Sequence, residues 1–294
     1  MAAPVIGIIG GSGLYDIDGL ADSSWRRVDS PFGPTSDEFC FGTLGGASVV
    51  FVPRHGRGHS LPPSEINFRA NIDALKRCGV TDIVSLSAVG SLRADLAPGD
   101  FVVVDQFVDR TFARPNSFFG AGCVAHVSMA HPVCGRIGDA LVAADPGLKR
   151  GGTYLVMEGP QFSTLAESEL YRAWNCDVIG MTNLPEAKLA REAEICYATV
   201  AMVTDYDCWH PDHDAVTVAM IVAVLQANAA KAKGLVARIV PRLAAEAGPC
   251  PRGCRHALDH ALITAPERRD PALVERLDSV AGRVLHGTSV EPSK

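Results

Sequence analysis

Short apolar, partly β-branched runs recur along the chain and are separated by polar, glycine-rich turns and by stretches of helical period. Runs of this length without polar alternation are typical of strands buried on both faces of a sheet. Alternation of such strands with helices predicts an α/β fold with a mostly parallel sheet. The predicted strands are Val5–Ile9, Ser48–Pro53, Ile83–Ser87, Phe101–Val104, Thr153–Met157, Val178–Thr182 and the first half of Thr199–Trp209.

Apolar residues at helical spacing, with capping residues at the ends, predict the helices. Ser64 and Thr164 are expected to cap two of them at the N-terminus, and Gly79 is expected to stop the first. The longest helix carries an apolar stripe, most of which should lie in the core. The predicted helices are 64–78, Leu165–Trp174, one beginning near Pro185, Val216–Leu243 and Pro271–Leu285.

The chain contains no internal repeat and no clear linker. Residues 21–46 read as a loop and hairpin region, and residues 110–131, which include His126, form a long irregular segment. Loops of that length inside a compact domain are usually functional or lie at an interface. We expect one main domain over residues 1–247. Residues 248–294, which open with a Pro/Gly/Cys break, are expected to form a helical extension that packs on the same domain.

Composition narrows the class of protein. The 294 residues are 47% hydrophobic, enough for one large domain or two at most, and the net charge of -6 without a basic block argues against nucleic acid as the main partner. No apolar run approaches the roughly 20 residues of a membrane span. The first residues lack the pattern of a signal peptide. We therefore expect a cytoplasmic protein without a membrane partner.

Cysteine usage supports the same compartment. The nine cysteines are an odd number scattered singly among apolar segments, which favours reduced thiols over a secreted disulfide framework. Cys250 and Cys254 are separated by three residues. A disulfide in the C-terminal segment is the alternative, and we interpret them as two reduced thiols without an assigned role.

Small, hydroxyl-bearing or basic residues follow several predicted strands and suggest an anion site. Gly10–Gly13 is a glycine-rich turn in which backbone N–H groups and the Ser12 hydroxyl can surround an anion, although a plain tight turn explains it equally. Arg54 and His55 come directly after a strand, where a guanidinium fork suits an oxyanion. The alternative for them is an exposed basic loop. The remaining residues of this kind are Ser87, Ala88 and Thr182.

Two carboxylates, Asp205 and Asp207, stand where the most apolar strand ends. Ligands of open α/β sheets bind at the carboxyl ends of strands, where acids can accept or donate protons. The alternative is a solvated turn or helix cap, since Asp favours both. An anion clamp beside proton-handling carboxylates suits phosphorolysis, in which phosphate attacks one face of a sugar while the leaving group is stabilised on the other.

Several short motifs, taken in order, resemble the trimeric purine nucleoside phosphorylase family, and within it the branch that cleaves 5′-methylthioadenosine. The resemblance covers roughly residues 5–245 and rests on Gly10-Gly-Ser-Gly-Leu14, Pro53-Arg-His-Gly56, Asn67-Phe-Arg-Ala-Asn71, Ala88-Val-Gly-Ser-Leu-Arg93, Glu158-Gly-Pro-Gln-Phe-Ser163, Met181-Thr-Asn-Leu-Pro-Glu186 and Thr204-Asp-Tyr-Asp-Cys-Trp209. It implies a single-domain mixed β-sheet, distorted into a partial barrel and surrounded by helices. It also implies a homotrimer, inorganic phosphate as co-substrate, and no cofactor or metal.

The resemblance also implies roles for individual residues. The phosphate site would be Ser12, Arg54, His55, Ser87, Ala88 and Thr182. Asp205 would protonate or hydrogen-bond N7 of the purine, with Asp207 supporting it and the 6-amino group. The other substrate contacts would be Met181 at the ribose, Phe162 and Ser163 at the base, Val218, Ile221 and Val222 around the 5′-methylthio group, and His126 from a neighbouring subunit.

Other functions remain open from the sequence. A 6-oxopurine or methylthioinosine phosphorylase could use the same scaffold, although two Asp residues favour a 6-amino group. A nucleosidase that uses water would have little need for Arg54 and His55. A metal hydrolase could draw on the polar residues of 205–214, but no pair there has a known zinc spacing. A non-catalytic nucleotide-binding module would bind adenine compounds without turnover. The three helical residues 218, 221 and 222 also fit ordinary core positions.

Overall fold

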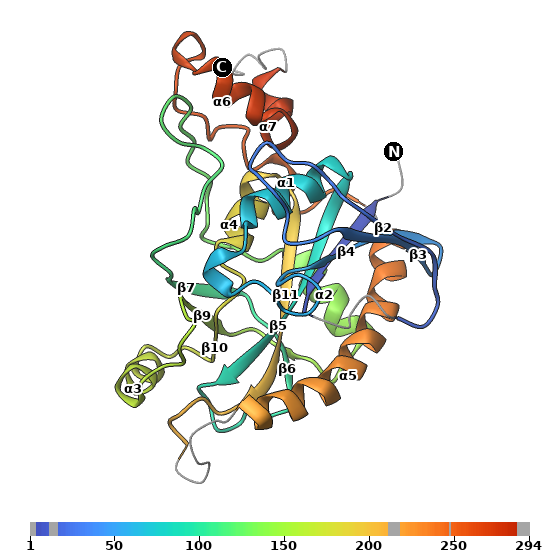
Figure 1. Cartoon of the computed structure of the whole chain (residues 1–294), viewed down its shortest axis with the longest axis vertical. Coiled ribbons are helices and arrows are strands. Elements are labelled where there is room, and N and C mark those ends of the chain that lie inside the picture. Colours follow the sequence, from blue (N-terminus) through green and yellow to red (C-terminus); the bar gives the residue numbers. More distant parts are fainter. Residues whose placement is uncertain (1–3, 12–16, 211–217, 247, 287–294) are drawn as a thin grey trace.

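The computed structural model describes residues 4–11, 17–210, 218–246 and 248–286. It is a mixed sheet of eleven strands with helices on both faces (Figure 1). The strands are β1 (Val5–Gly10), β2 (Leu20–Arg26), β3 (Phe39–Leu44), β4 (Ala47–Pro53), β5 (Val80–Ser91), β6 (Phe101–Val103), β7 (Gln106–Arg110), β8 (Lys149–Arg150), β9 (Thr153–Met157), β10 (Val178–Gly180) and β11 (Cys196–Asp205). The helices are α1 (Phe68–Arg77), α2 (Gly135–Ala144), α3 (Leu165–Ala173), α4 (Glu186–Glu192), α5 (Val218–Ala245), α6 (Pro271–Arg276) and α7 (Asp278–Leu285).

The sheet forks at β5. One path runs β2-β3-β4-β1-β5-β10-β9-β7, and a branch leaves β5 through β11 to β6 and β8. The first half of β5 lies between parallel β1 and parallel β11, while its last two residues pair with antiparallel β10. Every strand predicted from the apolar runs is present, and the mixed α/β architecture is confirmed. Both branches therefore meet along one strand.

The prediction that β5 ends at Ser87 is wrong. The strand continues to Ser91 because β11 and β10 go on offering hydrogen-bond partners, with Asp205 and Ile179 both paired to Gly90. Ser87 and Ala88 therefore lie inside a strand rather than after one.

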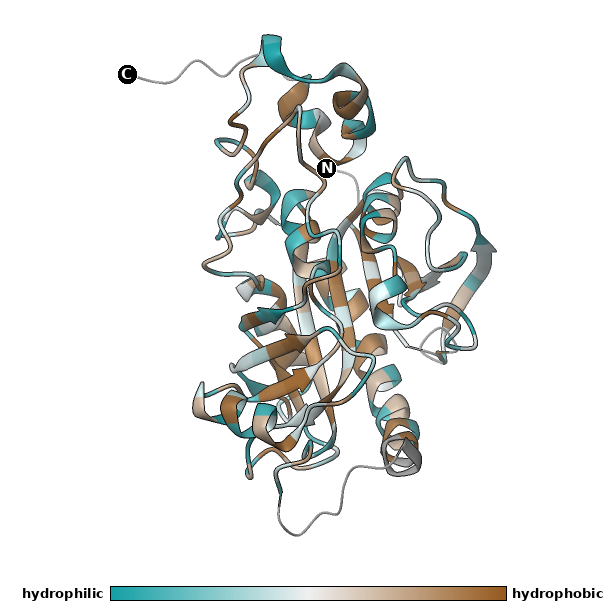
Figure 2. Ribbon diagram, turned by 60° about the vertical axis from the view of Figure 1, so that its left-hand side comes forward, coloured by the Kyte–Doolittle hydropathy of each residue, from teal (hydrophilic) through white to brown (hydrophobic). Residues whose placement is uncertain are grey.

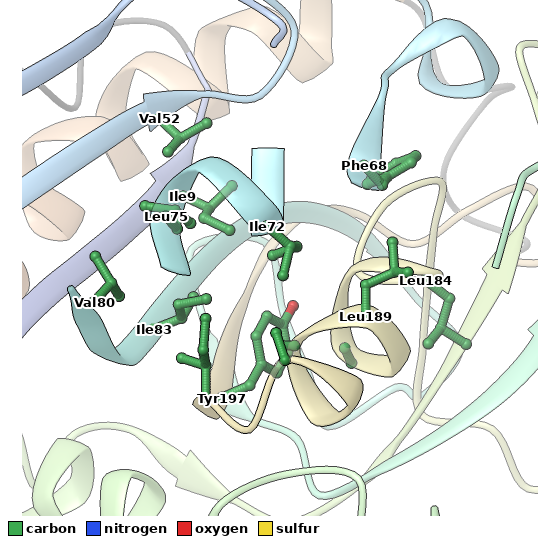
Figure 3. Packing of buried hydrophobic residues seen from close by; sticks show 14 of the residues in the cluster. Ile9, Val52, Phe68, Ile72, Leu75, Val80, Ile83, Leu184, Leu189 and Tyr197 are labelled. Carbon is green, nitrogen blue, oxygen red and sulfur yellow. The ribbon is translucent and has the colours of Figure 1, made fainter. Parts of the chain in front are cut away.

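Apolar side chains fill the space on both sides of the sheet. Residues of α1, α4 and α7 pack with one face, and Figure 3 shows part of this cluster around Tyr197. Residues of α2 and α5 pack with the other face. The central strands are hydrophobic along much of their length (Figure 2), as expected for strands buried between two helical layers.

The long helix α5 is only partly buried. Ala232, Val236, Ile239 and Leu243 are fully buried, which confirms the predicted core stripe over that part of the helix. Val222 and Leu225, nearer the N-terminus, are 44% and 38% exposed. The side chain of Asn228 donates a hydrogen bond to the carbonyl of Val203 at 3.0 Å, so this part of α5 runs beside the end of β11.

Helix ends agree with the sequence in two cases and differ in two. Thr164 forms a capping box with Glu167, and Gly79 terminates α1 with a φ of +76°, both as predicted. Ser64 does not cap α1, because the Asn67 side chain accepts the Ala70 N–H and Ser64 bonds to Glu158 instead. The predicted helix Pro271–Leu285 is divided into α6 and α7 at Leu277.

The C-terminal segment lies against α1. Leu277, Val280 and Ala281 belong to the first apolar cluster, and Arg283 forms an ion pair with the buried Glu194 at 2.6 Å. Within the described ranges, no helix is long and apolar enough to cross a membrane.

Candidate active site

The predicted site residues, which come from several strands, lie near the second half of β5. Register pairs join Ile9 of β1 to Ser85, and Ala201 of β11 to Ser87. Gly90 is paired with both Asp205 and Ile179. The segment after β4 reaches the middle of β5 through Arg54, which bonds to Ser85 and Leu86. The ends of β10 and β11 reach the same edge further along, at Gly90 near the tip of β5 (Figure 1).

Arg54, directly after β4, is buried in a hydrogen-bond network in which its charge is paired with a carboxylate. Its Nε and Nη2 donate to the two carboxylate oxygens of Glu186 at 2.9 and 3.2 Å. Further bonds run to Ser85 Oγ at 2.6 Å and to the carbonyl of Leu86 at 3.0 Å. The alternative of an exposed basic loop is therefore wrong for Arg54, which is a rigid, oriented cation.

Glu186 is a site residue that the sequence reasoning did not single out, although it ends the Met181–Glu186 motif. Burial opposes its ionisation, but the charge and hydrogen bonds of Arg54 hold the pKa of Glu186 below its ordinary value. Ser85 and Tyr197 also donate to its Oε1, at 2.7 and 2.8 Å. Loss of either charged partner would leave the other unpaired in the core.

His55 is held as a neutral ring with a defined tautomer. Its Nδ1 lies 2.9 Å from the carbonyl oxygen of Leu61, and since a carbonyl only accepts, Nδ1 carries the proton. Burial, and then the charge of Arg54, lower the pKa of His55 to about 4. At neutral pH its Nε2 is therefore an acceptor, suited to a protonated oxygen.

Ser87 and Thr182 form a buried pair of hydroxyls between β5 and the end of β10. Their oxygens are 2.6 Å apart, and Ser87 Oγ is 3.0 Å from the hydroxyl of Tyr154. A side chain at Gly180 would overlap that tyrosine hydroxyl, so glycine is required there. Ala88 is exposed although its neighbours in β5 are buried, which marks an opening onto this strand.

Asp205 and Asp207 lie together at the end of β11. Asp205 accepts the Thr204 hydroxyl at 2.6 Å and the Asp207 N–H at 2.8 Å, and Asp207 adopts a φ of +53°. Burial raises the pKa of both carboxyls, and the Asp205 charge raises that of Asp207 further. A Cβ on Gly90 would come within 2.9 Å of Asp205 Oδ1, so glycine makes room for the carboxylate.

The predicted ribose and base residues flank this pair. Met181 packs on Gly159, where φ is +72° and a Cβ would lie 2.5 Å from the methionine sulfur. The carbonyl of Ser163 accepts the Cys208 thiol at 3.5 Å, which sets residues 162–163 beside the carboxylates. Phe162 is 55% exposed and free to cover a ligand.

A second buried ion pair, also not predicted, anchors the segments around Met181. Arg114 donates from Nε to Glu158 at 3.0 Å, and from Nη1 to the carbonyls of Met181 and Leu184 at 2.7 and 2.8 Å. Burial opposes ionisation of Glu158, but bonds from Ser64, from two backbone N–H groups and from Arg114 lower its pKa to about 2. The long irregular segment is thereby attached to the site.

Some predicted residues are not brought to this edge. His126 is exposed, and its N–H donates to the carbonyl of Ala261 at 2.9 Å, on the part of the chain that runs toward α6 and α7 (Figure 1). Val222 is exposed near the start of α5. Ser12, the side chains of Val218 and Ile221, and residues 212–214 of the metal-hydrolase alternative lie outside the described residues.

Comparisons with known proteins show the family to which the chain belongs. The profile of the phosphorylase superfamily matches residues 5–241. The S-methyl-5′-thioadenosine phosphorylase of Cereibacter sphaeroides is 62% identical over 287 residues, covering 96% of this chain and 99% of its own length. The enzyme of the same name from Rhodospirillum rubrum is 63% identical over 286 residues, covering 96% and 97%.

Solved structures give the same result. The crystal structure of a methylthioadenosine phosphorylase from an Antarctic soil metagenomic library has a TM-score of 0.90 and 46% identity, and the match covers 95% of this chain and 99% of that one. The methylthioadenosine phosphorylase of Schistosoma mansoni in complex with adenine has a TM-score of 0.79 and 38% identity, covering 83% and 93%.

The fold and the site thus define a nucleoside phosphorylase. The chain belongs to the phosphorylase superfamily and, within it, to the S-methyl-5′-thioadenosine phosphorylases, which are pentosyltransferases.

Proposed function

We propose that this chain cleaves 5′-methylthioadenosine with inorganic phosphate, releasing adenine and 5-methylthioribose 1-phosphate. The observation that carries the proposal is the arrangement along β5. A basic and hydroxyl-rich end, with Arg54 and the Ser87–Thr182 pair, shares one sheet edge with the carboxylates after β11. Relatives over 60% identical along nearly their whole length carry the corresponding name.

Phosphate would bind at the basic end. Arg54 supplies a fixed positive field, the paired hydroxyls supply donors, and Nε2 of His55 accepts the proton of a monohydrogen phosphate. The exposed Ala88 leaves space above the strand for the anion. Ser12 completes the site in this proposal.

The purine would leave at the carboxylate end. Cleavage of the glycosidic bond passes through an oxocarbenium-like state, and the purine departs more easily when N7 receives a proton. Asp205, whose pKa is raised by burial, is suited to carry that proton or to hydrogen-bond N7. Asp207 accepts a hydrogen bond from the 6-amino group, which is a donor. A 6-oxo group would place an acceptor oxygen against the Asp207 carboxylate, and both acceptors would remain unpaired.

The sugar would lie between the two ends. Met181 would contact the ribose, and Phe162 and Ser163 the base. Val218, Ile221 and Val222 would surround the 5′-methylthio group, and the exposure of the apolar Val222 supports an unfilled apolar surface there.

A homotrimer would complete the pocket, with His126 entering from a neighbouring subunit. Two observations support an interface near this histidine. Phe112 and Ile263 are 86% and 63% exposed, and both are large apolar residues on the segments that flank it. Residues 248–294 would form an extension near the same interface.

All nine cysteines are free thiols, as expected for a protein that acts in the cytoplasm.

Product analysis tests the proposal. Purified protein is incubated with methylthioadenosine, with and without phosphate, and in parallel with methylthioinosine. The expected result is adenine release only with phosphate and a strong preference for the 6-amino substrate. Adenine release without phosphate would indicate a nucleosidase, and preference for methylthioinosine would contradict the assignment of Asp205 and Asp207 to a 6-amino base.

A further inference from the structure

Four cysteines from three distant parts of the chain meet on the α2–α5 side of the sheet. Cys134 precedes α2, Cys196 begins β11, and Cys250 and Cys254 lie in the C-terminal segment. Their sulfur atoms all lie within 4.8 Å of one another. Three of the four side chains are buried and Cys250 is partly buried. The cluster shares no residue with the site along β5.

The spacing of the sulfurs fits a metal better than a disulfide. Cys134 Sγ and Cys250 Sγ are 3.6 Å apart. Two sulfurs of a disulfide are about 2.05 Å apart. Sulfurs that coordinate one tetrahedral zinc ion at about 2.3 Å are separated by roughly 3.8 Å. One pair at 3.6 Å, with all four sulfurs within 4.8 Å of one another, is compatible with the corners of such a tetrahedron.

The loop that carries two of the thiols has the form of a metal-binding turn. Cys250 and Cys254 are separated by three residues, within the range of two to four that is usual for paired zinc ligands. The N–H of Gly253 donates to the carbonyl of Cys250 at 2.9 Å, and Gly253 has a φ of +64°. This tight turn directs both sulfurs to the same point.

We propose that Cys134, Cys196, Cys250 and Cys254 bind one structural zinc ion. Four thiolates close the tetrahedron and leave no position for substrate, so the ion would have no part in catalysis. Binding releases the four thiol protons, giving a zinc–tetrathiolate centre with a net charge of minus two. The positive charge of Arg191, which is 9% exposed, acts on Cys254 and offers partial compensation.

The residues around the four cysteines give a metal ion a path to the sulfurs, and a bound ion would link two parts of the fold. Cys250 lines a surface hollow together with Gly135, Arg136 and Arg252, through which an ion can reach the sulfurs. Once bound, the ion would tie the C-terminal segment to the first residue of β11. Because β11 ends at Asp205, this link would also fix the strand that carries the carboxylates.

Metal analysis of the full chain, purified with a thiol reductant, tests the proposal. The expected result is one tightly held zinc per chain. Titration of the metal-free protein with Co²⁺ should give the absorption bands of tetrahedral thiolate coordination, saturating at one equivalent. Chelator should lower the midpoint of thermal unfolding of the wild type.

Two variants and a matched control separate metal binding from a packing defect. Cys250→Ser changes the partly buried ligand, and the variant is expected to fold. Loss of an outer-shell partner of a ligand already weakens metal binding by about 10–100-fold, so loss of a ligand should weaken zinc binding by at least that factor. Cys254→Ala should do the same. Cys176→Ala removes an equally buried thiol outside the cluster and should keep full zinc and cobalt binding.

Three results would overturn the proposal. The first is a reduced wild type that binds no zinc or cobalt at one equivalent. The second is a cobalt spectrum that Cys250→Ser and Cys254→Ala leave unchanged. The third is a disulfide among the four cysteines, found after the thiols are alkylated at the moment of cell lysis.

Discussion

The two ends of the site differ in how their charges are held. At the end proposed to bind phosphate, Arg54 is matched by Glu186 in a bidentate pair that is buried in the core. At the carboxylate end, Asp205 is held by a hydroxyl and a backbone N–H, and no cation contributes to its pKa among the described residues. One end fixes a charge permanently, whereas the other leaves a carboxyl free to gain or lose a proton.

This difference suits the proposed division of labour. A paired cation that is also held by several hydrogen bonds keeps its position and needs no reorganisation when an anion arrives. A general acid needs a pKa closer to the working pH than a surface carboxyl has, and burial without a cation moves it in that direction. The two ends are therefore expected to respond differently to substitution.

The largest expected effect follows the removal of one partner of the Arg54–Glu186 ion pair. Arg54→Met would leave Glu186 buried without its partner and should lower the free energy of unfolding by about 3–5 kcal/mol. The double variant Arg54→Met/Glu186→Met should recover most of that stability while remaining unable to saturate with phosphate. Urea denaturation of both proteins measures this. A single variant as stable as the double one would contradict the structural role of the pair.

At the other end, Asp205→Asn should affect chemistry more than folding. We expect kcat to fall by about 10²–10⁴-fold, because the amide cannot transfer a proton. The fold should persist, since the amide oxygen can still accept the Asp207 N–H, while the Thr204 hydroxyl can donate to the carbonyl of Val89 instead and accept from the amide nitrogen. Steady-state kinetics and a thermal melt measure the two effects. An unchanged kcat would remove Asp205 from the proposed mechanism.

A third prediction concerns the space that Gly90 leaves for the carboxylate. Gly90→Ala brings a Cβ within 2.9 Å of Asp205 Oδ1 and should displace it, lowering kcat by up to about 10²-fold. Gly120→Ala is the matched control, since nothing lies within 4 Å of a Cβ there. Equal activity of the two variants would argue against a required position for Asp205.

A smaller effect is expected from pH. The pKa of His55 is lowered from 6.5 to about 4 in the folded protein, so between these values the unfolded chain binds the extra proton. The stability that the neutral ring contributes is therefore present above pH 6.5 and is lost as pH falls toward 4. Urea denaturation between pH 7.5 and 5 should show a shallower pH dependence for His55→Gln than for the wild type.

The sequence predicts most of the fold because its signals are local. Apolar runs and capping residues such as Thr164 depend on neighbours in the chain, and the predicted strands and some of the helix ends follow them. The extension of β5 to Ser91 depends on pairing with β10 and β11, which no local pattern records. The Arg54–Glu186 and Arg114–Glu158 pairs join residues 132 and 44 positions apart, so they emerged only from the structure.

The same limit applies to the site. Asp205, Asp207 and Thr182 stand at or beside strand ends, where composition and turn chemistry draw attention to them, whereas Ser87 lies inside β5. Cys134 and Cys196 carry no such mark, because each is a single apolar-looking residue in its own segment. Their meeting with Cys250 and Cys254 depends on the path of the C-terminal segment over the sheet.

The most direct test of the two-ended account is the rate of adenine release measured against phosphate concentration for the wild type, Thr182→Val and Asp205→Asn. The wild type should show no release at zero phosphate. Thr182→Val should move the curve to higher phosphate concentration with the same plateau, and Asp205→Asn should lower the plateau without moving the curve. Release at zero phosphate, or a shift of the phosphate curve by Asp205→Asn, would contradict the separation of the two ends.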